Sequence, residues 1–457
     1  MKWMLAATGL AISAGGVAVA ATAPLPEFQQ GRAGSILGTP AQIEADRHAL
    51  RIYNSKEVQA AIEELTAWYE KDSLAQMPDA RKTLRRAAKA MAMAQSFGAV
   101  AADPDRAQAL WGTTGPHSWG DVVLPVEGIM IDNPDNIYRT IPIDGAAQYV
   151  IEGRVIHTAP VQETFVLHNE KSGADPNQKI KSQEDENGSV TLGTIPVAYD
   201  GTFTITVDNS PANGRTNHLQ SDPNVHDAYI LVRDTIPDWS RQNPVQLNVK
   251  RVGGPPVKPP ASDAELAAKA AKMTLGVGRY FVTWIKQRSL NGPANGFPQQ
   301  FDRASGWGFI KCGWYQLEPD EALVITLDRR NAAYLGFQLS DAWGQGQDSE
   351  FMGNLGSLSG HQARANADGT YTYVISGKDP GVYNWLDTSG MRMGTYCVRW
   401  QALPAGVKGA GADKLTKVVK LSGLDQVLPA ETVRVTAEQR AAQIAQRRKD
   451  YSRRLQY

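Results

Sequence analysis

The sequence predicts a mainly β protein with flanking helices, in which two jelly-roll-like β-sandwich domains follow one another along the chain. Short runs of β-branched and aromatic residues alternate with clusters of Asn, Asp, Gly and Pro, a pattern typical of sandwiches and jelly rolls. The 457 residues include 42 glycines and 26 prolines, which suits many turns between short strands. This length leaves room for two or three domains.

The first residues have the features of a bacterial signal peptide. Lys2 precedes an apolar stretch over residues 3–19, and Ala18-Val19-Ala20 forms a small-residue cleavage site. The apolar stretch is short and interrupted by glycine, so we expect residues 1–21 to be cleaved rather than to stay as a membrane anchor. No later segment is apolar enough to span a bilayer. The predicted location is therefore periplasmic or secreted.

The domain plan follows from changes in pattern along the chain. Residues 22–105 show helical spacing, with Val58, Ile62, Leu65 and Tyr69 on one face. Residues 106–253 contain strand patterns and form the first predicted β domain. A proline-rich linker at 254–261 leads to a helix and a second β domain at 262–405.

The last segment, residues 406–457, is predicted to be a tail that carries a basic helix. One interpretation is a helix that binds a membrane surface or a partner. The other is a helix packed on the protein body with its arginines facing water, because its apolar face is thin.

Composition excludes several functional classes. The formal net charge is zero, which argues against a nucleic-acid partner. The sequence contains no Gly-x-Ser-x-Gly elbow and no glycine-rich nucleotide loop after a strand, so neither a serine hydrolase of that type nor a nucleotide-binding protein is expected. We predict no cofactor.

The only two cysteines, Cys312 and Cys397, both fall in strand-like stretches of the second predicted β domain. An oxidising compartment permits a disulfide between them. The sequence leaves a disulfide and two buried free thiols equally open.

The second β region carries a series of short motifs in order: Asp368-Gly369-Thr370, Val374-Ile375-Ser376, Asp379-Pro380-Gly381, Asn384-Trp385-Leu386-Asp387 and Arg399-Trp400. Over about residues 280–403 this series resembles the family catalogued as domain of unknown function 1214. The segment Asp132-Asn133-Pro134-Asp135-Asn136-Ile137-Tyr138-Arg139 is similar to openings in the related family 1254. The resemblance implies a double jelly roll, and it implies no activity. Asp387-Thr388 departs from the proline that many relatives have after Asn-Trp-Leu.

The turn at Asn384, Trp385 and Asp387 is a candidate ligand site. An amide, an indole and a carboxylate together can form a platform for a sugar. Alternatively, Trp385 closes the end of the barrel and Asn384 bonds its own turn backbone.

The loop at Asp341 and Trp343 is a second candidate, because a carboxylate beside an indole at a strand end often has a functional role. Asp341 and Asp387 are therefore the candidate catalytic carboxylates, which would support glycoside hydrolysis if their separation were right. Trp343 and Arg399 join Asn384 and Trp385 as candidate ligand-binding residues. The alternative is a solvated acidic loop, which also contains Asp348 and Glu350.

A metal site is not expected, because no His-x-His or His-Glu-x-x-His spacing occurs. The weak candidates are His218, His226 and Asp222, which flank or lie in one loop.

The leading functional prediction is a protein that binds carbohydrate or another envelope-associated ligand, since the chain has 11 tryptophans, several of them in predicted loops. The first alternative is a hydrolase or lyase that acts on a glycan or a small aromatic compound through loop carboxylates. The second is a structural or assembly module that associates as a homo-oligomer. Whether the protein is an enzyme is left open.

Overall fold

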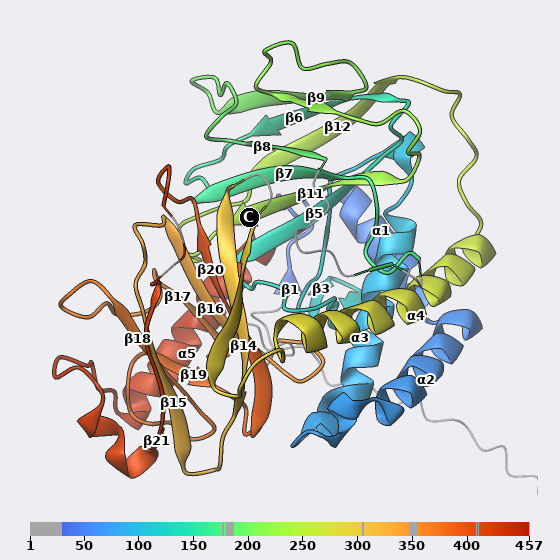
Figure 1. Ribbon diagram of the computed structural model, residues 1–457. Helices are drawn as coiled ribbons and strands as arrows, with labels where there is room; N and C mark the ends of the chain where they lie inside the picture. The colour runs from blue at the N-terminus through green and yellow to red at the C-terminus, as the bar shows by residue number, and fades with distance from the viewer. Residues whose placement is uncertain are drawn as a thin grey trace, which may run out of the picture.

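The computed structural model describes residues 30–175, 178–179, 187–303, 306–346, 354–407, 409 and 411–456. The fold is mainly β, with two sandwich-like pairs of sheets and a group of helices beside them (Figure 1). This confirms the predicted fold class. The predicted signal peptide lies outside the described residues. Within those residues, no helix combines the length and the apolar character that a membrane span requires.

Four helices form one layer: α1 (Pro40–Tyr53), α2 (Lys56–Lys71), α3 (Ala80–Val100) and α4 (Asp263–Arg288). The side chains of Thr39, Ser55 and Ser262 cap the first, second and fourth by accepting backbone N–H bonds. Although α4 follows the linker, it packs against α2 and α3 (Figure 1). A Cβ at Gly278 would lie 2.7 Å from Leu65 Cδ2, so the absent side chain allows this close approach. The short 3₁₀ turns are η2 (Ser73–Gln76), η3 (Pro104–Arg106), η4 (Leu421–Gln426) and η5 (Arg453–Leu455).

The first sandwich consists of a five-stranded and a four-stranded sheet. The five-stranded sheet has the order β2 (Leu110–Gly112), β5 (Asn136–Ile143), β11 (Ala228–Thr235), β7 (Gln162–His168) and β8 (Gly188–Thr191). The four-stranded sheet has the order β10 (His218–Gln220), β9 (Thr202–Asp208), β6 (Gln148–Arg154) and β12 (Gln246–Gly253). A small separate sheet joins β1 (Gln30–Gly31), β3 (His117–Trp119) and β4 (Val122–Leu124).

Strand alternation gives the five-stranded sheet two different faces. Ile230 of β11 lies opposite Ile141 of β5 and Leu167 of β7, and all three belong to the sandwich core. Because successive side chains point to opposite faces, the neighbouring residues Tyr229 and Leu231 point away from that core. This outer face is the one that the site uses.

The second sandwich also pairs a five-stranded with a four-stranded sheet. The five-stranded sheet has the order β13 (Gly296–Asp302), β14 (Gly308–Gln316), β20 (Met393–Gln401), β16 (Tyr334–Ser340) and β17 (Ser357–Ser359). The other has the order β19 (Trp385–Asp387), β18 (Tyr371–Ser376), β15 (Glu321–Leu327) and β21 (Asp413–Lys420). Strand β21 lies beyond residue 405, so this sandwich takes in part of the predicted tail.

The two cysteines form a disulfide. Cys312 of β14 lies directly opposite Cys397 of β20, with their Cα atoms 4.2 Å apart. Of the two alternatives left open by the sequence, the structure has the bonded one. The bond joins two strands of the sheet face that packs against the helices.

The basic C-terminal helix, α5 (Ala437–Ser452), packs on the body with part of its basic face inward. Arg440 lies 2.9 Å from Asp379, and the Arg447 guanidinium lies 4.5 Å from the centre of the Trp239 ring. Both arginines are buried. The helix thus packs on the protein body, as the second interpretation expected. The expectation that its arginines face water is wrong for Arg440 and Arg447.

Candidate functional site

A cavity of about 360 Å³ lies where the first sandwich, the helical layer and the second sandwich meet. Its size falls in the range of small-molecule sites, which often form between domains. Each of the three layers contributes one wall.

The first wall is the outer face of the five-stranded sheet of the first sandwich. Tyr138 and Thr140 alternate along β5, and Tyr229, Leu231 and Arg233 alternate along β11, and all five line the cavity. Arg233 lies opposite Tyr138 in the antiparallel register, and Leu231 lies opposite Thr140. The period of two residues that buries Ile141 and Ile230 in the core therefore points these side chains into the cavity.

The second wall is formed by one face of α4 and one face of α3. The α4 residues that line the cavity recur at helical spacing: Met273, Val277, Tyr280, Phe281, Trp284 and Arg288. From α3 come Ala94, Phe97 and Gly98, and Ala101 follows directly after it. This wall is apolar and largely aromatic, which favours an apolar or aromatic ligand body.

Three arginines from separate strands or strand ends reach the cavity: Arg233 of β11, Arg303 directly after β13, and Arg399 of β20. The guanidinium groups of Arg233 and Arg303 lie 5.4 and 4.9 Å from the centre of the Trp307 ring. Burial and the nearby charge of Arg399 lower the pKa of Arg303 to about 10. Arg303 therefore remains cationic at neutral pH.

Arg399 is fixed by two hydrogen bonds. Its guanidinium donates to the Gln338 side-chain oxygen and to the Ile131 carbonyl, and the side chain is buried. Gln338 in turn donates to the Asp132 carbonyl over 2.8 Å. These bonds join β16 and β20 of the second sandwich to the segment that precedes β5.

Asp132 lies on that segment and lines the cavity. Its Oδ2 accepts a hydrogen bond of 2.9 Å from the Ile129 N–H, which orients the carboxyl. Burial raises the pKa of Asp132 to about 7, and the attraction of Arg399 only partly opposes this. The group therefore exchanges its proton near neutral pH.

Glu127 is the second buried carboxyl of the cavity wall. Its Oε2 accepts a 3.0 Å hydrogen bond from the Thr113 N–H. Burial raises the pKa of Glu127 well above its ordinary value, and the nearby Asp46 adds to the effect. Both effects favour the protonated form of Glu127.

The cavity wall carries net positive charge. The basic side chains that line it are Lys171, Arg233, Arg288, Arg303 and Arg399, and the acidic ones are Glu127, Asp132, Glu170 and Asp302. Burial lowers the pKa of Lys171 to about 8, so it is mostly cationic at pH 7. The basic side chains outnumber the acidic ones, and burial further reduces the negative charge of Asp132 and Glu127.

Among the residues that the sequence singled out as catalytic or ligand-binding, Arg399 lines this cavity. Asp341 and Trp343 instead lie beneath α3. Asp341 is 0% exposed, lies 3.2 Å from Arg86, and accepts hydrogen bonds from the Trp343 and Gln345 N–H groups. The Trp343 ring stacks on Tyr69 with their centres 4.5 Å apart, and its N–H donates to the Ala80 carbonyl. These contacts are those of core residues.

The turn at Asn384 and Trp385 also has a structural arrangement. The Asn384 amide donates to the carbonyls of Arg364 and Thr372 and accepts from the Arg364 N–H. Trp385 is 7% exposed, and its indole N–H donates to the Ser376 carbonyl. An exposed stacking platform is thus not present at this turn. Asp387 accepts a 2.7 Å hydrogen bond from the Ser389 N–H and does not line the cavity.

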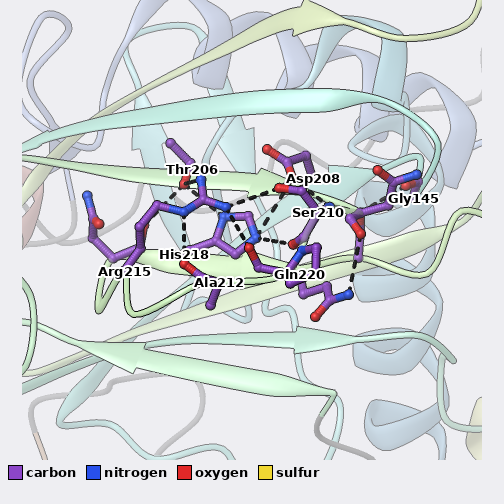
Figure 2. Close-up of polar contacts among 12 residues, drawn as sticks. Gly145, Thr206, Asp208, Ser210, Ala212, Arg215, His218 and Gln220 are labelled. Carbon is purple, nitrogen blue, oxygen red and sulfur yellow. Dashed lines mark hydrogen bonds and ion pairs between the residues drawn. The ribbon is translucent and has the colours of Figure 1, made fainter.

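The weak metal candidates have separate partners. The two ring nitrogens of His218 lie 2.9 Å from Thr206 Oγ1 and 2.8 Å from the Ser210 carbonyl (Figure 2). His226 pairs with Asp144 over 2.9 Å, and Asp222 accepts the Asn224 N–H within its turn. In the part of the chain that the structure describes, no three His, Cys, Asp or Glu side chains gather as a metal site. Asp348 and Glu350 lie outside that part.

Sequence reasoning missed most of the cavity. The segment that begins at Asp132 resembles a family opening, but no role was predicted for the Asp132 carboxyl. The alternation in β11 and the aromatic face of α4 were visible signals. Neither indicates which elements face one another, because the three walls come from distant parts of the chain.

The chain is similar to the crystal structure of an uncharacterized protein from Burkholderia cenocepacia, with 23% identity and a TM-score of 0.61, over 82% of this chain and 99% of that one. This similarity shows the fold. The VPA0106 protein from Vibrio parahaemolyticus has 10% identity and a TM-score of 0.37, over 83% of this chain and 99% of that one. No family model and no curated protein matches the chain. Membership of the family that the motifs resemble stays a prediction.

Proposed function

We propose that the protein binds a small organic anion with an aromatic or other apolar body in the cavity between its two sandwiches. The observation that carries this proposal is the convergence of Arg233, Arg303 and Arg399 on an otherwise largely apolar cavity. Guanidinium groups match the geometry of carboxylate and phosphate oxygens, and they pair strongly where water is excluded.

The polar and the apolar parts of the cavity wall contact different parts of the ligand. The arginines and Asp132 provide the polar end, and Tyr280, Phe281 and Trp284 of α4 provide an aromatic surface. A ligand of this kind corresponds to the small aromatic compound considered from the sequence. The carbohydrate alternative has less support, because Trp343 and Trp385 are buried.

Export to the periplasm or the medium belongs to the same proposal. Two observations support it: the signal-peptide features of residues 1–21, and the disulfide between Cys312 and Cys397. Disulfides persist in oxidising compartments and are rare in the bacterial cytosol.

Calorimetric and thermal-shift titrations with 4-phenylbutanoate test the proposal, with 4-phenylbutanol as the neutral counterpart of the same size. At 100 times its dissociation constant, the anion should stabilise the fold by about 2.7 kcal/mol. Arg303→Met should weaken binding by about ten-fold or more, because it removes a charge-assisted contact. Arg81→Met, at an exposed position of α3, is the control. Equal binding of the anion and the alcohol would overturn the proposal.

A further inference from the structure

A second, smaller cavity lies next to the main one. It has a volume of about 30 Å³, and polar residues of its wall include Thr114, Gln338, Gln345 and Ser357. A chamber of about 10–15 Å³ or more holds one water molecule when polar partners are present. This chamber therefore has the size and the chemistry to hold one or two waters.

The chamber and the main cavity share three wall residues: Thr113, Glu127 and Asp132. Glu127 and Asp132 thus line both the space for water and the space for the organic anion. Backbone N–H groups hold both of them, since Ile129 donates to Asp132 and Thr113 donates to Glu127. The walls behind them are also fixed: the Gln345 amide donates to the Gly128 and Ile129 carbonyls over 3.4 and 3.3 Å.

We propose, on the basis of the anion-binding function above, that this site hydrolyses an ester of an anionic aromatic substrate. Asp132 is the general base for a water in the small chamber, and Glu127 is the general acid for the leaving oxygen. The substrate class is a half-ester, which offers one free carboxylate to the arginines and one ester bond to the carboxyls.

The proton and electron balance needs no reagent besides water. The water oxygen forms a bond to the ester carbon, while one of its protons passes to the Asp132 carboxylate. The Arg399 guanidinium stabilises the charge that develops on the carbonyl oxygen. The bond from carbon to the leaving oxygen then breaks, and Glu127 gives its proton to that oxygen. The proton that Asp132 took from water then passes to Glu127, which restores both carboxyls, and the new acid product loses its own proton to solvent.

The environments of the two carboxyls suit these opposite roles. Asp132 has a pKa of about 7, so about half of it is an ionised base at neutral pH, whereas burial and the charge of Asp46 both favour the protonated form of Glu127. The charge of Arg399 acts on Asp132, and the charge of Asp46 in α1 acts on Glu127. Arg303 lies near Arg399 on the side of the second sandwich. Two acids whose environments separate their pKa values are typical of acid–base catalysis.

The test uses the full chain with monobenzyl succinate, and with benzyl butyrate as the uncharged ester of similar shape. The charged ester should be hydrolysed with a much higher kcat/KM than the uncharged one. Asp132→Asn should lower kcat/KM by at least about 100-fold and remove the rise of the rate through about pH 7. Asp121→Asn, at an exposed site, is the matched control and should leave the rate unchanged.

The role of Glu127 is tested by comparing two esters with different leaving groups. Glu127→Gln should lower kcat/KM by about 100-fold for monobenzyl succinate, whose alcohol leaves poorly without a proton. The loss should be below about ten-fold for 4-nitrophenyl succinate, because nitrophenolate leaves without an acid. Equal losses for both esters would overturn the assignment of Glu127.

Binding of 4-phenylbutanoate separates the two levels of the proposal. If Asp132→Asn binds this anion at least as tightly as the parent protein does, the variant is folded and a lost rate reports on chemistry. If the parent protein binds the anion but hydrolyses monobenzyl succinate no faster than Asp132→Asn does, hydrolysis is refuted and the binding site stands. If neither binding nor hydrolysis occurs, both proposals fall.

Discussion

Asp341 directly follows β16 and Asp132 lies on the segment before β5, and their surroundings give the two carboxylates different chemistry. Asp341 is enclosed by the core and paired with Arg86, whereas Asp132 lines the cavity between the sandwiches. Sequence reasoning selected Asp341 because an indole follows it two residues later. The same Trp343 is in fact what buries the loop, together with Tyr69. A carboxylate beside an aromatic residue in sequence therefore does not distinguish a site from a core.

The pairing of Asp341 with Arg86 gives a prediction about stability. Arg86→Met should cost about 2–3 kcal/mol at pH 8, since it leaves a buried carboxylate without its counterion. The side chain of Arg86 is 26% exposed, so the expected cost is at the lower end for buried pairs. Urea unfolding measures it, and Arg81→Met on the same helix should change the free energy of unfolding by less than about 0.5 kcal/mol.

The pH dependence of this effect has a defined sign. Burial raises the pKa of Asp341 above its ordinary 3.8 despite Arg86, so the folded state holds this proton more tightly than the unfolded state. Stability from this group is therefore highest at low pH and falls as the pH rises through the folded pKa. Removal of Arg86 raises that pKa further, so the variant should lose more stability between pH 5 and pH 8 than the parent. An equal loss in both proteins would contradict the pairing.

At the scale of elements, the C-terminal helix shows a pattern that counts of apolar residues do not detect. Arg440, Arg447 and Arg454 recur every seven residues, which is close to two helical turns, and all three are buried. Arg440 lies over the Trp385 ring, and Arg447 and Arg454 lie over Trp239. Arg440 and Arg447 therefore serve as the packing face of α5, and Arg454 continues this face in η5. This explains why a helix with a thin apolar face is nevertheless attached to the body.

Arg447→Ala should destabilise the protein by about 2–3 kcal/mol. The change removes a stack on Trp239 and hydrogen bonds to the Asn354 carbonyl and the Gln362 side chain, at 3.0 and 2.7 Å. Lys449→Ala lies on the exposed side of the same helix and is the matched control. If both variants unfold at the same urea concentration, the buried arginines of α5 do not contribute to the stability of the protein.

The strands and most helices were predictable because their signals are local. Alternation over residues 228–235 marks β11, and Ser262 with Glu265 marks the start of α4 as a capping box. The sequence assigned α4 to the second β domain, but its packing against α2 and α3 could not be predicted from such local signals. Its position on α2 and α3 depends on contacts such as Gly278 against Leu65, which are far apart in sequence.

At the scale of the whole molecule, two sandwiches were predictable and their junction was not. The segment that begins at Asp132 provides much of that junction. The Tyr334 hydroxyl of the second sandwich lies 2.8 Å from Asp135 Oδ2, and the Asn133 amide donates to it over 2.8 Å. Asn133 also accepts the Asp135 N–H, which forms a local turn. One short segment thus places Asp132 and Tyr138 at the cavity while it binds the other domain.

If this junction sets the geometry of the cavity, weakening it should reduce anion binding without any change in the residues of the cavity wall. Tyr334→Phe should cost about 1–3 kcal/mol, because the buried Asp135 and Asn133 lose a partner. It should also weaken 4-phenylbutanoate several-fold, since Asp132 and Arg399 are positioned through the same segment.

Tyr373→Phe is a matched control. This tyrosine is also fully buried in the second sandwich, and its hydroxyl makes no hydrogen bond within the residues that the structure describes. Removal of the Tyr373 hydroxyl should be neutral or slightly stabilising and should leave anion affinity unchanged, because no buried group loses a hydrogen-bond partner. If Tyr334→Phe lowered stability but left affinity intact, the junction would hold the domains together without shaping the cavity. The strands alone would then position the three arginines around the cavity.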